Sequence, residues 1–243
     1  MRKIFGRIWL AWGGFWFVLF FLLIYPALYV LLKNQKTHRS ADKLRKFWGK
    51  ISSIFSGMIP SITYEVPLDK SKQYVICPNH LSYLDIVTTG GFLPTFNFFM
   101  AKMELSNVPL FNIWFKTIDV PVKRENLRSA HGAFVLAGEK LENGGSLIIF
   151  PEGRIPDDAP KIHPFKPGAF RLAIEKKLPV VPVTIIDNIK RLDITDWTCT
   201  PGRMRMYVHA PIETSHLSID DVDALSKQVY SIIHQKLTEL KVL

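Results

Sequence analysis

Cysteine is scarce in this 243-residue chain, in which Cys77 and Cys199 stand far apart. Two thiols spaced in this way form neither a disulfide framework nor a zinc-ligand pattern. Acidic residues are also in the minority, with 21 Asp and Glu against 31 Lys and Arg, which gives a formal net charge of +10. This excess predicts an acidic partner, such as nucleic acid, anionic lipid or a phosphate-bearing substrate.

Charge is absent from residues 8–32, a run dominated by Trp, Phe, Leu and Ile. The run reaches the roughly 20 apolar residues that are needed to cross a bilayer. A cleaved signal peptide would have a shorter apolar core and a small-residue cleavage site, and neither is found. Basic residues flank the run on both sides, and the larger cluster that follows it predicts that the C-terminal side lies in the cytoplasm.

Residues 40–58 have apolar side chains at helical spacing, with basic residues on the opposite face and Trp48 among them. This pattern is typical of an in-plane amphipathic helix on anionic lipid. Either the first helix spans the membrane and the second lies on its surface, or both enter one leaflet as a hairpin, which a bend at Pro26 favours. A third alternative is that the second helix packs as core against the globular domain.

Beyond residue 60 short apolar runs alternate with helical patterns. The expected strands are 62–66, 74–77, 96–101, 117–122, 147–150, 180–186 and 205–209, and the expected helices are 82–92, 127–143, 169–176 and 219–240. Strands interleaved with helices predict an α/β fold, in which helices cover the sheet. We therefore expect two parts: a membrane-anchoring helical hairpin at 1–59 and an α/β domain at 60–243.

A histidine and an aspartate follow the strand expected at 74–77. With His80 in the turn and Asp85 in the first helical turns, the carboxylate can fold back onto the imidazole and fix its tautomer. That pair would be a general base and its orienter. The spacing alone is weak evidence, because His216 and Asp221 repeat it in a stretch that is typical of a helix start.

Three further blocks follow other expected strands. Phe150-Pro151-Glu152-Gly153 has a chance probability on the order of 0.002, and its turn residues would expose Glu152 and Arg154 at the end of a strand. Residues 118–124 place basic side chains after a strand, and residues 178–183 form a proline-flanked apolar strand.

In this order and at these separations, the four blocks resemble the glycerolipid acyltransferase family, which contains the lysophosphatidic acid acyltransferases. The resemblance covers residues 60–215 and implies that family's fold, a mixed sheet flanked by helices behind a two-helix membrane anchor. The family's catalytic histidine and aspartate fall on His80 and Asp85. Its substrate-binding residues fall on Lys102, Arg124, Glu152 and Gly153.

One departure concerns the arginine of the third block. The family has threonine or serine after the glycine and then arginine, whereas Arg154 follows Gly153 directly. The displaced guanidinium motivates an alternative acceptor, a lyso-amino-acid lipid or another lysophospholipid. A non-catalytic lipid-binding protein is the second alternative, and the intact His80–Asp85 pair speaks against it.

The resemblance implies direct acyl transfer from a thioester to the hydroxyl of lysophosphatidic acid, with His80 as the base. Lys102, Arg124 and Arg154 would hold the acceptor's phosphate, and backbone N–H groups near Gly153 would stabilise the oxyanion. We expect acyl-CoA or acyl carrier protein as co-substrate, and no metal or other cofactor. The expected partners are membrane lipid and a lysophospholipid acceptor, with the catalytic domain on the cytoplasmic face of the cell membrane. A nucleic-acid partner is not expected, because the basic residues cluster beside the apolar run.

Overall fold

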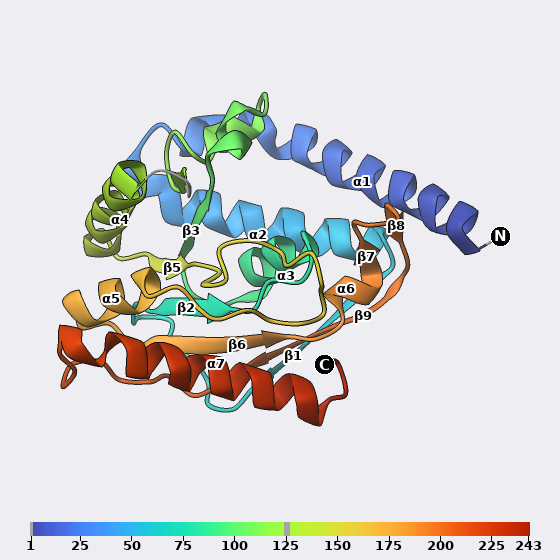
Figure 1. The fold of residues 1–243 in the computed structure, drawn as a ribbon. Coiled ribbons are helices and arrows are strands. Elements are labelled where there is room, and N and C mark those ends of the chain that lie inside the picture. The colour runs from blue at the N-terminus through green and yellow to red at the C-terminus, as the bar shows by residue number, and fades with distance from the viewer. Residues whose placement is uncertain (1, 124–126) are drawn as a thin grey trace.

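A seven-stranded mixed sheet organises the chain (Figure 1). The structure is a computed structural model that describes residues 2–123 and 127–243. The strand order is β1-β9-β6-β2-β5-β3-β4. The strands are β1 Met58–Tyr64, β2 Val75–Pro78, β3 Asn97–Lys102, β4 Val120–Val122, β5 Ser146–Ile148, β6 Val180–Ile185 and β9 Gly202–Val208.

Five neighbouring strands, β6, β2, β5, β3 and β4, run parallel to one another. β9 is antiparallel to β6, and β1 is parallel to β9. Every residue of β2, β5 and β6 is buried, as expected for parallel strands that are covered on both faces. Because parallel strands end at the same edge, the loops that follow these five strands meet at one edge of the sheet.

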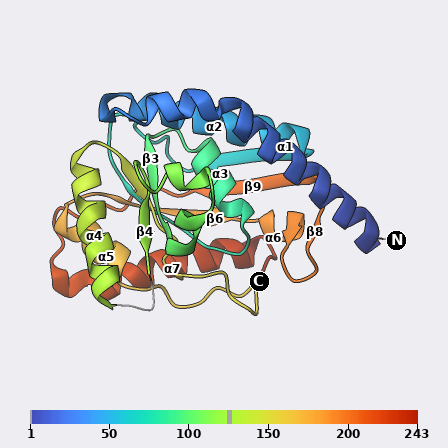
Figure 2. The ribbon, with the colours of Figure 1, turned by 90° about the horizontal axis from the view of Figure 1, so that it is seen from above.

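Helices cover both faces of this sheet (Figures 1 and 2). They are α3 Leu84–Phe92, α4 Leu127–Glu142, α5 Gly168–Glu175, α6 Asn188–Arg191 and α7 Val222–Glu239. Along β2 the side chains alternate between two cores: Val75 and Cys77 join one apolar cluster and Ile76 joins the other. The expected α/β fold, a mixed sheet flanked by helices, is therefore confirmed.

Some short elements were not expected from the sequence. The two-residue strands β7 Leu192–Asp193 and β8 Thr198–Cys199 form a separate hairpin, and 3-10 turns cover Gln35–Thr37, Met103–Asn107 and Phe111–Ile113. A further 3-10 turn, Ile219–Asp221, forms the start of the helix expected at 219–240. Elements this short have too few residues to show a hydrophobic period. β1 also begins at Met58, four residues before the strand expected at 62–66. The division of the chain at residues 59 and 60 stays a prediction.

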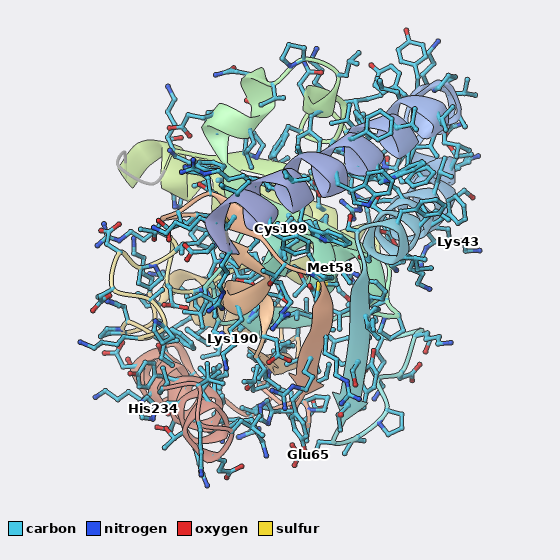
Figure 3. All side chains as sticks on the ribbon, turned by 90° about the vertical axis from the view of Figure 1, so that its right-hand side faces the viewer. Lys43, Met58, Glu65, Lys190, Cys199 and His234 are labelled. Carbon is cyan, nitrogen blue, oxygen red and sulfur yellow. The ribbon has the colours of Figure 1, made fainter. Side chains whose placement is uncertain are left out.

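The first helix, α1 (Arg2–Leu31), is long and apolar enough to cross a membrane, with 17% of its most apolar window buried in the protein. Among the described residues no other helix passes this test. The N-terminal part of α1 lies across the outside of the domain, over the region of Met58 and Cys199 (Figure 3). This part packs on β8, where Gly6 has no space for a side chain against Thr198.

The second helix, α2 (His38–Phe55), packs between α1 and α3. Its indole at Trp48 is buried, stacks near Phe17 and Phe21, and donates to the Phe17 carbonyl over 2.9 Å. Trp48 therefore contacts the first helix, which corrects its expected place among the basic residues of a lipid-facing helix. The two-helix membrane anchor is not confirmed as such, because one face of α2 is part of the protein's core.

A buried ion cluster joins α2 to the sheet. The guanidinium of Arg45 contacts Asp42 at 2.8 Å and Asp119 at 3.1 Å, and it also donates to the Asn97 carbonyl. Asp119 accepts the N–H of Phe99 at 2.9 Å, so the cluster connects the helix with β3 and with the segment before β4. Two carboxylates around one guanidinium balance the cost of burying this charge.

Candidate active site

The turn after β2 brings His80 and Asp85 together. The imidazole Nδ1 lies 3.1 Å from Oδ2 of Asp85, and both side chains are buried. The strand ends at Pro78, the turn carries the histidine, and α3 begins at Leu84, so the carboxylate in the first helical turn reaches back to the ring. This contact holds the proton on Nδ1 and leaves Nε2 as the acceptor of the neutral ring.

Both carboxylate oxygens of Asp85 accept hydrogen bonds. Its Oδ2 also accepts the main-chain N–H groups of Leu81 at 2.7 Å and Ser82 at 2.8 Å. Its Oδ1 accepts the side-chain amide of Asn188 at 2.9 Å, from the beginning of α6. Four donors therefore converge on this one buried carboxylate. A carboxylate held in this way beside a histidine fixes the orientation of the ring.

Glu152 ties the loop after β5 to the same turn. Its Oε1 accepts the main-chain N–H of His80 at 2.8 Å, and its Oε2 accepts that of His163 at 3.1 Å. Burial raises the pKa of Glu152 to about 7, against the opposing effect of these two N–H donors. Both carboxylate oxygens contact the protein's own backbone, so Glu152 holds two loops in place.

The ring of His80 lies flat against Phe150. The ring centroids are 4.0 Å apart and the planes differ by 21°. Phe150 also lines an apolar cavity of about 120 Å³, together with Met100, Phe134 and Ile149. The cavity adjoins the imidazole through this one shared phenyl ring, so apolar side chains lie next to the histidine.

The expected phosphate ligands lie at the ends of neighbouring parallel strands. Lys102 is the last residue of β3, and Arg154 lies in the loop that follows β5. Both side chains are exposed. Lys102 pairs with Glu104 at 3.3 Å and Arg154 with Asp157 at 3.8 Å. In the described part of the chain neither forms a hydrogen bond or ion pair with His80 or Asp85. Arg124 lies outside the described residues.

Gly153 has a φ of +80°, the left-handed conformation that glycine adopts without strain. Its N–H donates to the Phe150 carbonyl at 3.0 Å. That amide is used within the turn, so the expectation that it stabilises an oxyanion is not supported for Gly153 itself. The second histidine–aspartate spacing is a helix start, since Asp221 and Ser218 form a capping box.

Sequence reasoning missed two contacts of this site, Asn188 with Asp85 and Phe150 with the His80 ring. Asn188 lies just past the end of β6, at the edge of the sheet where functional residues gather. This position after an expected strand could have marked Asn188 as a candidate site residue. Its distance of more than a hundred positions from Asp85 gave no local pattern to connect the two. Phe150 can stack on His80 only if its side chain lies on the same side of the sheet as the imidazole. The sequence Phe150-Pro151-Glu152-Gly153 does not indicate on which side it lies.

Residues 60–186 match the family described as Acyltransferase. The chain belongs to the acyltransferase family. The match includes both the His80 turn and the Glu152 loop, and it ends just before Asn188.

This acyltransferase is similar along its whole length to a crystal structure. The 1-acyl-sn-glycerophosphate (LPA) acyltransferase PlsC from Thermotoga maritima aligns with a TM-score of 0.81 and 26% identity, over 100% of this chain and 99% of that one. The 1-acyl-sn-glycerol-3-phosphate acyltransferase of Haemophilus influenzae is 24% identical over 80% of each chain. A chloroplastic relative from Brassica napus is 29% identical over 80% of this acyltransferase, which spans 57% of that relative's length.

Proposed function

We propose that this acyltransferase transfers a fatty acyl group from an acyl thioester to the free hydroxyl of lysophosphatidic acid, which gives phosphatidic acid. The observation that carries the proposal is the buried contact of His80 with Asp85, at a strand end beside an apolar cavity. The names of the similar proteins supply the acceptor.

In the proposed reaction Nε2 of His80 takes the proton of the acceptor hydroxyl while its oxygen attacks the thioester carbonyl. The tetrahedral intermediate collapses, the C–S bond breaks and the new ester forms. The imidazolium then returns the proton to the leaving thiolate, so no net charge or proton is lost. Asp85 stabilises the transient imidazolium through the 3.1 Å contact.

Cys77 is not proposed as a covalent nucleophile. Its thiol is fully buried in β2, and burial raises its pKa, so the thiolate is disfavoured. Ser82 is buried as well, and its hydroxyl donates to the Leu192 carbonyl at 3.1 Å. Direct transfer, without an acyl-enzyme, is the proposed route.

Lys102 and Arg154 are proposed to bind the acceptor's phosphate, with Arg124 as a third cation. Their present partners, Glu104 and Asp157, are exposed and weakly held, so a phosphate can replace them at low cost. Glu152 and Gly153 are proposed to shape the loop that carries Arg154. The direct Gly153-Arg154 sequence keeps a second candidate open, the same chemistry on another lysolipid.

We also propose that α1 lies in one leaflet, with the catalytic domain on the cytoplasmic face. Indoles of Trp9 and Trp12 donate to the Ser56 and Phe55 carbonyls at 3.0 Å, and Lys3 pairs with Asp196 at 2.9 Å. Because α1 contacts the rest of the protein at Lys3 and again at Trp9 and Trp12, this part of the helix lies alongside the domain. Large apolar side chains on the outer side of α1, such as Leu23 at 67% exposure, would enter the lipid.

The test uses purified protein in lipid micelles, lysophosphatidic acid and a panel of other lysolipids, each with acyl-CoA and with acyl carrier protein, and identifies products by mass. We expect phosphatidic acid, and a loss of about 10²–10⁴-fold in kcat for His80→Ala. His131→Ala, on the exposed side of α4, is the matched control. A His80→Ala variant that is as active as the wild type would falsify the catalytic assignment.

A further inference from the structure

A second cavity lies at the opposite edge of the sheet from His80. It occupies about 430 Å³ between the start of α2, the segment before β3 and the outer side of α4. Phe96 and Phe98 line it, at the beginning of β3, whereas the catalytic turn follows the end of the parallel strand β2. Its volume lies within the roughly 300–1,000 Å³ range of small-molecule sites. Of the expected substrate-binding residues that the structure describes, which are Lys102, Glu152, Gly153 and Arg154, none lines it.

Cations dominate the walls of this cavity. Lys36 comes from the α1–α2 connection, Arg39 from the first turn of α2 and Lys140 from α4. Glu139 is the one carboxylate among the lining residues that the structure describes. Elements that are a hundred positions apart in sequence thus bring three positive charges around one space. In Figure 1 the connection between the blue helices lies beside α4. Positive charges that lie close together repel one another, and an anion bound among them would offset this repulsion.

The cations are held in place and keep donors for a ligand. Arg39 donates to the Gly144 carbonyl at 3.1 Å and lies over the Phe96 ring at 5.3 Å. Lys140 donates to the Thr117 carbonyl. Each of these hydrogen bonds uses one N–H group. Arg39 has five such donors in its guanidinium and Lys140 has three in its ammonium, so both keep donors for a ligand. Within the described part of the chain, no hydrogen bond or ion pair engages the Lys36 ammonium.

His38 also lines the cavity, beside these cations. Burial lowers its pKa, the charge of Lys140 lowers it further, and the Leu32 carbonyl at 3.3 Å opposes both. The pKa of Lys140 is also lowered, mainly by burial. An anion beside the two groups would favour the charged form of each.

We propose that this cavity binds a phosphate group, separately from the acceptor and the acyl donor. A phosphate suits the site because its three oxygens can accept from the Arg39 fork and from two lysines together. The cavity has more space than a bare phosphate needs, and Tyr29 and Val30 at the end of α1 expose apolar surface nearby in the chain. The source is therefore either an anionic phospholipid headgroup or free phosphate.

The test follows the His38 ring by NMR, in full-length protein with ¹⁵N-labelled histidine in detergent micelles. The signal is assigned through its loss in His38→Gln. Inorganic phosphate, dihexanoyl phosphatidic acid and dihexanoyl phosphatidylcholine are titrated separately. We expect a saturable shift of the His38 signal toward the charged ring. Phosphatidic acid acting at a tenfold lower concentration than inorganic phosphate indicates a headgroup site, and equal potency indicates a site for free phosphate.

Variants separate this site from the catalytic one. Arg39→Gln/Lys140→Gln is expected to weaken binding at least tenfold, and Lys36→Gln, which removes no contact with the protein, about threefold. Lys190→Gln/Lys227→Gln, two exposed lysines on α6 and α7, is the matched control. Lys102→Gln/Arg154→Gln leaves the His38 response unchanged. An unmoved His38 signal, an equal response to phosphatidylcholine, or equal weakening by the control pair overturns the proposal.

Discussion

The side-chain amide of Asn188 lies 2.9 Å from Oδ1 of Asp85 and 2.9 Å from the Thr88 hydroxyl, while its own amide oxygen is buried with no hydrogen-bond partner among the described residues. A buried polar atom left unpaired is costly. The side chain of Asn188 is therefore oriented so that its amide donates to Asp85, although its own oxygen then lacks a donor. It is a positioning residue that acts on His80 through the carboxylate.

Replacement of Asn188 by alanine is expected to lower kcat about tenfold and leave KM unchanged, because a hydrogen bond to a charged group contributes roughly 1.5–3 kcal/mol. Steady-state kinetics on lysophosphatidic acid measure the two constants separately. Gln228→Ala, on the exposed side of α7, is the control. A fall in activity that only follows a loss of folded protein would assign Asn188 a structural role instead.

Glu152 gives the stability of this fold a pH dependence. Its pKa is raised to about 7 from 4.5 in the folded state, so the folded protein binds a proton more tightly than the unfolded chain does. The stabilisation is fully present below pH 4.5 and is lost as the pH rises through about 7. The shift corresponds to about 3 kcal/mol as an upper value.

Chemical denaturation of the wild type and of Glu152→Gln from pH 4.5 to 8 measures this contribution. We expect the wild type to lose stability relative to the variant as the pH rises, with no further change above pH 8. Glutamine keeps one carbonyl acceptor for the two N–H donors, so the variant is the less stable protein at low pH. Parallel curves for the two proteins would contradict the raised pKa.

The sequence predicts most of the sheet and the pairing of His80 with Asp85, because both depend on local patterns. Apolar runs indicate β2, β5 and β6, with glycines before β5 and a proline before β6. The spacing of His80 and Asp85 became informative only together with the other blocks, because His216 and Asp221 repeat it. Other features depend on partners far along the chain. The amphipathic pattern of 40–58 is typical of a lipid-facing helix and leaves packing against the domain as an alternative, and Arg45 is buried with Asp119, 74 positions away. No helical period reveals a buried arginine whose partner lies on another element.

Loss of the Arg45 guanidinium is expected to destabilise the fold strongly. Arg45→Met leaves the buried Asp119 without the cation that it contacts, which typically costs 3–5 kcal/mol. Asp42 keeps its ion pair with Lys46, at 2.8 Å. Burial already raises the pKa of Asp119, and Arg45 opposes that effect. The penalty should therefore shrink as the pH falls and the carboxylates are protonated. Denaturant titration at pH 7 and pH 5 measures both effects.

The control for Arg45→Met is Lys43→Met, an exposed position on the same helix that is labelled in Figure 3. It should change the free energy of unfolding by less than about 0.5 kcal/mol. The double variant Arg45→Met/Asp119→Asn should recover part of the loss, since one uncompensated charge is removed. Equal effects of Arg45→Met and Lys43→Met would show that the cluster does not hold α2 to the sheet.

The close approach of α2 to α3 depends on two glycines. A Cβ atom added at Gly49 would lie 3.2 Å from the Cα of Gly91, which is backbone and cannot rotate away. Gly49→Ala therefore forces the helices apart, and we expect a loss of about 1 kcal/mol in the free energy of unfolding, since overpacking outweighs the gain in helix propensity. Gly132→Ala in α4, where the added Cβ meets no described atom within 4 Å, should instead gain up to about 1 kcal/mol. Because the two substitutions are chemically identical, a gain in the free energy of unfolding for both in a denaturant titration would mean that α2 and α3 can move apart at little cost.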